Sequence, residues 1–255
     1  MSKEGTKAES ATARPRIAIP EPCSYDLEYS TRALPPYLRA VEAAGGEPVV
    51  IPLGSAPEEI ARAVTGCDAV LLPGSKADVD PQKYNATKHP KTAPADQQRD
   101  AADELLLQDA YNLGKPVFGI CYGLQALNVW RTGTLRQHIE SGVNHSVGAK
   151  VEIAHRVVVA ADSLLASKMP EGAKETAVAV NSSHHQSAEV VGDGLRAVAV
   201  CPEDGVIEAI EGTEPEHYVL AVQWHPERSF ERDKVSGKLF QEFVGAARKW
   251  SARRE

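Results

Sequence analysis

The stretch VFGICYGLQ, residues 117–125, decides the fold class of this 255-residue chain. It begins as a short apolar run typical of a buried parallel strand and continues into a helical pattern from Leu124 onward. Gly119 and Gly123 flank Cys121 as G-x-C-x-G, and small residues at these positions permit a tight, strained strand-to-helix turn. The pattern therefore predicts an elbow that presents Cys121 at the carboxyl edge of a sheet, where open α/β sheets bind ligands.

Cys121 is a candidate nucleophile at this elbow. Backbone N–H groups at the start of the following helix favour an anion, so we expect them to lower the thiol pKa. The alternative is a buried, unreactive cysteine on a tight turn.

Before the elbow, short apolar segments alternate with helical patterns. This alternation predicts an α/β fold, with βαβ units, a mainly parallel central sheet and helices on both faces. The predicted strands are residues 16–20, 47–53, 68–74 and 115–120, and the predicted helices are residues 30–45, 56–66 and 94–113.

After the elbow helix, the segments are strand-like and joined by short turns, which predicts an antiparallel or mixed extension of the sheet. These segments are residues 150–161, 176–180, 194–201, 205–212 and 217–224, and a closing helix follows near residues 232–248. Without an internal repeat or linker, residues 15–255 are expected to form a single domain. Residues 1–14 lack an apolar run, so they predict a disordered tail and not a secretory signal.

A thiolate nucleophile needs a basic partner, usually a histidine that a third group orients. The segment AVQWHPE, residues 221–227, supplies His225 at the end of a predicted strand and Glu227 two residues later. The chain order is thus cysteine, histidine, carboxylate. A structural, hydrogen-bonded histidine is the alternative.

A strand also ends at Gly74, in LLPGS (residues 71–75). Its N–H, together with the N–H of Tyr122, is a candidate oxyanion hole. The alternative for Gly74 is an ordinary turn.

The composition excludes several classes of protein. The chain has 28 Lys and Arg against 35 Asp and Glu, a net charge of −7, which disfavours nucleic acid and anionic membranes as partners. The four cysteines are far apart and form no C-x-x-C, which indicates reduced thiols and a cytoplasmic location. No nucleotide-binding glycine motif is present. The adjacent His184 and His185 would face opposite ways on a strand, so we expect no metal site there.

Together these segments resemble the class I glutamine amidotransferase superfamily. They are most similar to its stand-alone gamma-glutamyl hydrolases, the group that includes gamma-glutamyl-gamma-aminobutyrate hydrolase. The resemblance covers nearly all of the chain after the tail and implies a flavodoxin-like sheet. Its landmarks are PGSKADVDPQKY (73–84), GICYGLQALNV (119–129), GTLRQHI (133–139), VNSSHHQ (180–186), DGVIEAIE (204–211) and AVQWHPE (221–227).

The resemblance implies a catalytic triad. Cys121 attacks the gamma-carbonyl of a glutamyl group to form a thioester, His225 transfers the proton, and Glu227 orients His225. The N–H groups of Gly74 and Tyr122 bind the oxyanion. No cofactor and no metal is implied.

The resemblance also assigns substrate contacts to Gln125, Ser183 and His184. Two departures from the family pattern leave the choice of substrate open: Tyr122 stands where relatives often have Arg, and residues 131–133 read Arg-Thr-Gly where a Gly-Gly pair is common.

The expected function is therefore a cytoplasmic hydrolase that cleaves small gamma-glutamyl conjugates and releases glutamate. Its partner is the small-molecule substrate, and the resemblance allows a homodimer. One alternative is the glutaminase subunit of an amidotransferase that acts with a separate synthase. The other is a binding or regulatory module without activity.

Overall fold

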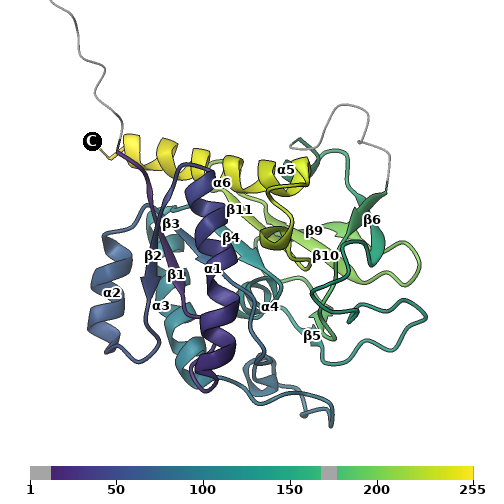
Figure 1. The fold of residues 1–255 in the computed structure, drawn as a ribbon. Helices are drawn as coiled ribbons and strands as arrows, with labels where there is room; N and C mark the ends of the chain where they lie inside the picture. Colours follow the sequence, from purple (N-terminus) through teal and green to yellow (C-terminus); the bar gives the residue numbers. More distant parts are fainter. Residues whose placement is uncertain (1–12, 168–176, 255) are drawn as a thin grey trace, which may run out of the picture.

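A computed structural model describes residues 13–167 and 177–254 of the chain. Its centre is a nine-stranded sheet with the strand order β2-β1-β3-β4-β11-β10-β9-β6-β7 (Figure 1). The first five strands in this order run parallel, which gives the flavodoxin-like arrangement 2-1-3-4-5 when β11 is counted as the fifth. The predicted α/β fold class is confirmed.

The parallel half contains the four strands predicted before the elbow: β1 (Arg16–Pro20), β2 (Glu47–Ile51), β3 (Ala69–Leu72) and β4 (Val117–Ile120). It also contains β11 (Val219–Val222), which was predicted as part of the extension but pairs in parallel with β4. All residues of β3, β4 and β11 are buried, because helices cover both faces of the sheet there.

The antiparallel half confirms the predicted extension. It comprises β6 (His155–Val159), β7 (Val178–Val180), β9 (Leu195–Val200) and β10 (Ile207–Gly212). Two short strands, β5 (Leu135–Arg136) and β8 (Ser187–Ala188), form a separate pair.

The helices form two layers (Figure 1). On one face, α1 (Leu27–Ala43) and α6 (Lys234–Ala252) share a hydrophobic core that contains Phe118, Phe240 and Phe243. A second core joins the other face to α2 (Pro57–Thr65), α3 (Gln97–Leu113) and α4 (Tyr122–Trp130). The remaining short elements are α5 (Leu164–Ser167) and the 3₁₀ turns at Pro81–Tyr84 and Pro226–Arg228.

The boundaries differ from the predicted ones by a few residues. Helix α1 begins at Leu27, three residues before the predicted start, because the Asp26 side chain accepts the N–H of Tyr29 as an N-cap. Strand β6 is shorter than its predicted segment. Residues 1–12 of the predicted tail lie outside the described residues.

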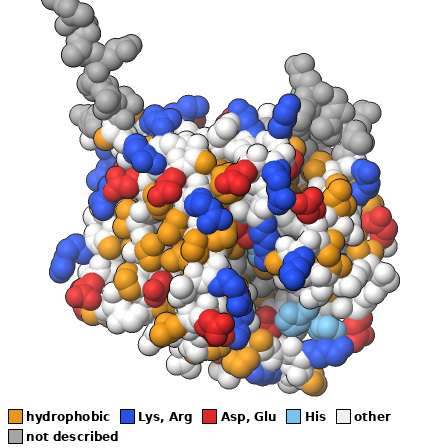
Figure 2. Space-filling model, viewed as in Figure 1, with side chains coloured by type: hydrophobic (Ala, Val, Ile, Leu, Met, Phe, Trp, Pro, Cys, Tyr) orange, Lys and Arg blue, Asp and Glu red, His pale blue; other side chains and the backbone are white. Residues whose placement is uncertain are grey.

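In the described residues, no helix is long and apolar enough to cross a membrane. The face seen in Figure 2 intersperses Lys and Arg with Asp and Glu over its whole extent.

The elbow depends on two glycines. A Cβ on Gly123 would overlap the carbonyl oxygen of Leu72 and lie 2.7 Å from the Leu72 Cβ. A Cβ on Gly119 would lie 2.9 Å from the Ala221 Cβ and from the Gly123 carbonyl oxygen. Helix α4 therefore packs directly against the backbone of the sheet, and this contact fixes the position of Cys121.

We expect Gly123→Ala to lower the free energy of unfolding by roughly 1–3 kcal/mol, because the added methyl group forces α4 away from β3. Gly245→Ala is the matched control, since a Cβ on this α6 residue meets nothing within 4 Å. That variant should equal the wild type or gain up to about 1 kcal/mol from helix propensity. Urea denaturation measures both, and equal stabilities for the two variants would contradict the proposed contact.

Candidate active site

Cys121 and His225 follow neighbouring parallel strands of the sheet. Cys121 comes directly after β4 and His225 three residues after β11, and the register pairs Ile120 with Val222. The carboxyl ends of the two strands therefore bring these residues to one edge of the sheet. Gly74 follows β3, the strand on the other side of β4.

The Cys121 backbone is strained, as the elbow pattern predicts. Its φ of 54° and ψ of −103° lie in a region that residues with a side chain rarely occupy. Its N–H donates to the carbonyl of Val222 at 2.8 Å, which ties the elbow to β11. Only 6% of Cys121 is exposed.

His225 and Glu227 form a buried pair. The Nδ1 of His225 lies 2.8 Å from Oε1 of Glu227, and both residues are 4% exposed. Since a carboxylate accepts a proton, Nδ1 carries the hydrogen and Nε2 keeps a lone pair in the neutral ring. Within the described part of the chain, Nε2 has no hydrogen-bond partner. It is therefore free to accept a proton.

Burial controls the titration of these groups. It raises the pKa of the Cys121 thiol to about 12, and the carboxylate of Glu227 adds to this. Arg228 and the N–H of Tyr122 lower the thiol pKa, but by less. The helix N-terminus thus acts in the expected direction, whereas the expected net lowering of the pKa is wrong.

His225 is a neutral base at pH 7. Burial lowers its pKa below the ordinary value, although the Glu227 carboxylate opposes the shift. Burial also raises the pKa of Glu227, but the His225 ring and Arg228 outweigh it and hold this pKa below its usual range. The pair therefore consists of a carboxylate and an uncharged imidazole.

Gly74 lies against both Cys121 and His225. A Cβ on Gly74 would be 3.1 Å from Cε1 of His225 and 3.7 Å from the Cβ of Cys121. Its N–H donates to the hydroxyl of Tyr37 on α1 at 3.0 Å. Tyr37 was not predicted as a site residue, because its sequence context is that of an ordinary buried position on an amphipathic helix.

Asn181 is another residue that the sequence analysis missed. Its side-chain amide donates to the carbonyl of His225 and accepts the His225 N–H, both at 2.9 Å. Asn181 lies in the VNSSHHQ segment, and its role becomes visible only when the fold places this segment beside the backbone of His225. Asn181 thus fixes the backbone that carries the candidate base.

Two of the candidate substrate residues, Ser183 and Gln125, contact sequence neighbours of the pair. Ser183 accepts a hydrogen bond from Arg228 at 2.9 Å, and the Nε of Arg228 lies 3.5 Å from Glu227. Gln125 donates to the carbonyl of Gln186 and lies 3.2 Å from the side-chain oxygen of Gln223. These contacts connect α4, the segment before β8 and the end of β11.

The His184 side chain contacts a different part of the molecule. Its Nδ1 lies 2.9 Å from the carbonyl of Gln186, and its Nε2 is directed toward Glu208 of β10 at 3.5 Å. His185 points the other way and contacts Asp78 at 3.1 Å. The two adjacent histidines therefore face opposite ways, as predicted.

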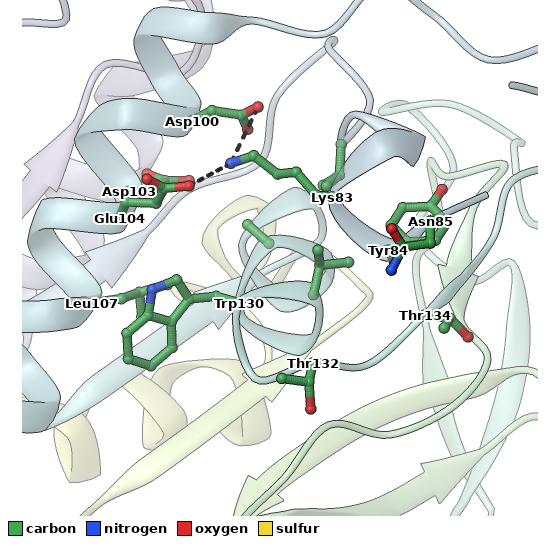
Figure 3. A pocket seen from close by; sticks show the side chains of 13 residues that line it. Lys83, Tyr84, Asn85, Asp100, Asp103, Glu104, Leu107, Trp130, Thr132 and Thr134 are labelled. Carbon is green, nitrogen blue, oxygen red and sulfur yellow. Dashed lines mark hydrogen bonds and ion pairs between the residues drawn. The ribbon is translucent and has the colours of Figure 1, made fainter. Parts of the chain in front are cut away.

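Tyr122 extends from the elbow toward α3. Its hydroxyl donates to Asp100 at 2.7 Å, and the guanidinium of Arg99 lies 4.8 Å from its ring centre. Asp100 lines a cavity of about 540 Å³ on this side of α4, where Lys83 pairs with Asp100 and Glu104 (Figure 3). The lining of this cavity contains none of the triad candidates.

The second departure from the family pattern borders the same cavity. Thr132 has a φ of 71°, a left-handed conformation that favours glycine, and this explains why a Gly-Gly pair suits the position. Its hydroxyl donates to the carboxylate of Asp193 at 3.0 Å, which stabilises the turn. The side chains of both departures, Tyr122 and Thr132, therefore lie toward the cavity that Asp100 lines and not toward the triad candidates.

Glu227→Gln should lower the pKa of His225 further, because the variant loses the negative charge that now raises it. Protonation of His225 removes the base, so any acid limb of activity should move to lower pH. NMR titration of labelled histidine rings measures the shift, with Glu28→Gln, an exposed residue on α1, as the control. An unchanged or raised His225 pKa would contradict this geometry.

Comparisons with known proteins identify the family of the chain. Residues 23–227 match the peptidase C26 family. Protein NtpR of Enterococcus hirae is 33% identical over 214 residues, which cover 82% of this chain and 86% of that protein. The gamma-glutamyl-gamma-aminobutyrate hydrolase PuuD of Escherichia coli K12 is 32% identical over 220 residues, 82% of this chain and 84% of that protein.

The fold is similar to that of a solved structure from Thermoplasma acidophilum, described as a "putative gmp synthase subunit a protein". The TM-score is 0.65 at 13% identity, over 95% of this chain and 99% of the other. The sheet order, the elbow and the matched residues lead to one assignment. The chain belongs to the peptidase C26 family of class I glutamine amidotransferase-like proteins.

Proposed function

We propose that this protein hydrolyses the gamma-glutamyl amide bond of small gamma-glutamyl conjugates through a thioester on Cys121. The observation that carries the proposal is the buried His225–Glu227 pair at the sheet edge that also carries the strained Cys121 elbow. The Nε2 atom of His225 has no hydrogen-bond partner among residues 13–167 and 177–254. Nucleophilic catalysis by a thiol uses such a base to take the thiol proton, and the neighbouring ends of β4 and β11 bring Cys121 and His225 to the same edge.

The first half of the proposed reaction forms the thioester. The Cys121 sulfur attacks the gamma-carbonyl carbon while its proton passes to Nε2 of His225. The tetrahedral intermediate carries its negative charge on the former carbonyl oxygen, which the N–H groups of Gly74 and Tyr122 stabilise. The carbon–nitrogen bond then breaks, and His225 gives its proton to the leaving amine.

The second half releases glutamate. A water molecule gives a proton to His225 and attacks the thioester carbon. The carbon–sulfur bond breaks, the sulfur regains the proton from His225, and the gamma-carboxyl group of glutamate is formed. Glu227 holds the imidazole in one tautomer through both halves and stabilises its charged form.

The raised pKa of Cys121 fits this sequence of steps. A thiol with a pKa of about 12 remains protonated at pH 7, so its proton leaves only as the attack proceeds. The buried thiol is thereby protected from oxidation in the absence of substrate.

For the substrate, we favour a gamma-glutamyl-gamma-aminobutyrate-like conjugate. The support is the 32% identity with the Escherichia coli hydrolase over most of both chains. Gln125 and Ser183 are the proposed contacts of the glutamyl end. Ser183 accepts a hydrogen bond from Arg228, which also contacts Glu227, and Gln125 contacts Gln223, two residues before His225. We place the activity in the cytoplasm, which suits the four free cysteines.

Cys121→Ala should lower glutamate release from a gamma-glutamyl conjugate by roughly 10³-fold or more, because no other group replaces the nucleophile. Cys67→Ala, another buried cysteine that lies on α2's side of the sheet, is the matched control and should keep wild-type turnover. The panel contains gamma-glutamyl-aminobutyrate, gamma-glutamyl peptides, folate polyglutamate and free glutamine.

The panel separates the alternatives. Release from a conjugate but not from glutamine supports a dedicated hydrolase. Slow turnover of glutamine alone indicates a glutaminase subunit that requires a synthase. Unchanged release after Cys121→Ala would refute the thioester mechanism.

The Tyr37 hydroxyl competes for the proposed oxyanion donor, because Gly74 N–H donates to it at 3.0 Å. If Gly74 binds the oxyanion, Tyr37→Phe should keep kcat within about threefold, since only a competing acceptor is removed. A loss of 10²-fold or more in a folded variant would instead identify the Tyr37 hydroxyl as the donor. Steady-state kinetics with circular dichroism as a folding check makes the distinction.

A further inference from the structure

A second group of buried side chains surrounds the carboxylate of Glu208 on β10. His145, His155 and His184 converge on Glu208 from three segments, and all four residues are at most 8% exposed. His145 lies in the loop before β6, His155 on β6, and His184 in the segment before β8. None of the four takes part in the proposed reaction.

The outer nitrogens of two of these rings are held by acceptors. The Nε2 of His145 lies 2.9 Å from the carboxylate of Asp204, and Nδ1 of His184 lies 2.9 Å from the carbonyl of Gln186. Because neither a carboxylate nor a carbonyl donates, both nitrogens carry hydrogen. In the neutral rings, His145 Nδ1 and His184 Nε2 therefore present lone pairs.

These lone pairs face the same oxygen. His145 Nδ1 lies 3.1 Å and His184 Nε2 lies 3.5 Å from Oε1 of Glu208. Neither nitrogen has a hydrogen bond among the described residues, and neither does Oε2 of Glu208. Two lone pairs and a carboxylate that meet away from water repel one another, so the cluster requires a positive charge at its centre, either a proton on an imidazole or a bound cation.

The donor set is that of a zinc site. Two imidazole nitrogens and one carboxylate oxygen bind Zn²⁺ at about 2.0–2.2 Å, which sets the ligand atoms of a tetrahedron roughly 3.3–3.5 Å apart. The separations of 3.1 and 3.5 Å match this geometry, and the three donor atoms lie within 4.8 Å of one another.

The surroundings also suit a metal. Asp204 and the Gln186 carbonyl orient the two imidazoles, as outer acceptors do for zinc-bound histidines. His155 Nε2 contacts Oε1 of Glu208 at 2.9 Å and orients the carboxylate. We propose that His145, His184 and Glu208 form a binding site for a zinc ion.

The proposed site lies in the antiparallel half of the fold. His184 N–H and the Ser182 hydroxyl both donate to the carbonyl of His145, so a bound ion fixes their two loops on β10. The neighbouring Asn181 holds the backbone of His225. The ion takes no part in the proposed reaction, and His184 is a ligand in place of the substrate contact that the resemblance implies.

The sequence predicted no metal site, because the adjacent His184 and His185 cannot both bind one ion. His185 does face away, toward Asp78, but the fold supplies His145 and Glu208 as partners for His184 from distant positions.

Calorimetric titration of the chelator-treated protein with Zn²⁺ tests the proposal. We expect one zinc ion per chain at micromolar affinity or tighter and a rise in Tm of several degrees. Co²⁺ in the same site should give the visible absorption of a tetrahedral centre. None of these readouts depends on glutamate release, so the zinc site and the proposed function fail separately.

His145→Gln and Glu208→Gln should each weaken zinc binding by at least tenfold, with circular dichroism to show that they fold. His185→Gln is the matched control, because His185 belongs to a separate group with His89 and His138 nearer the surface. It should bind zinc like the wild type. The proposal is overturned if the folded wild type binds no zinc, or if His185→Gln abolishes binding while His145→Gln does not.

Discussion

The contact between helix α4 and the backbone of β3 is the constraint on which the rest of the site depends. Gly123 has no room for a Cβ against Leu72, and Gly119 has none against Ala221. With α4 held this close, the chain turns within one residue, and that residue is Cys121 at a φ of 54°. The strain is stabilised by the surrounding sheet, because β11 accepts the Cys121 N–H, and the turn places Cys121 at the edge where β3, β4 and β11 end.

Burial gives this edge its chemical character. Away from water, the thiol and the imidazole are both uncharged and the Glu227 carboxylate is paired, so the resting site stores little unbalanced charge. Charge arises only during a reaction, and the groups that would stabilise it are already fixed. The same burial explains why a cysteine at a helix N-terminus has a raised and not a lowered pKa.

The antiparallel half supports the parallel half. It carries Asn181, whose side chain is hydrogen-bonded to the His225 backbone, and Glu208, whose carboxylate is contacted by nitrogens of three histidines. A flavodoxin-like sheet alone would leave the segment that carries His225 without the hydrogen bonds that Asn181 makes to it. The extension supplies these hydrogen bonds. Its packing depends on a cluster of buried polar groups, and each atom of that cluster left without a partner costs free energy.

The sequence by itself determined the order of strands and helices, the elbow and the cysteine–histidine–carboxylate candidates. These features follow from local sterics and from the periodicity of apolar residues, both of which are properties of neighbouring positions. Only the tertiary structure decided that Tyr37 meets Gly74, that Asn181 holds His225, and that His184 turns toward Glu208 and His145. It also decided the sign of the Cys121 pKa shift. The physical reason is the same in each case: burial and pairing depend on residues tens of positions apart, which no local pattern connects.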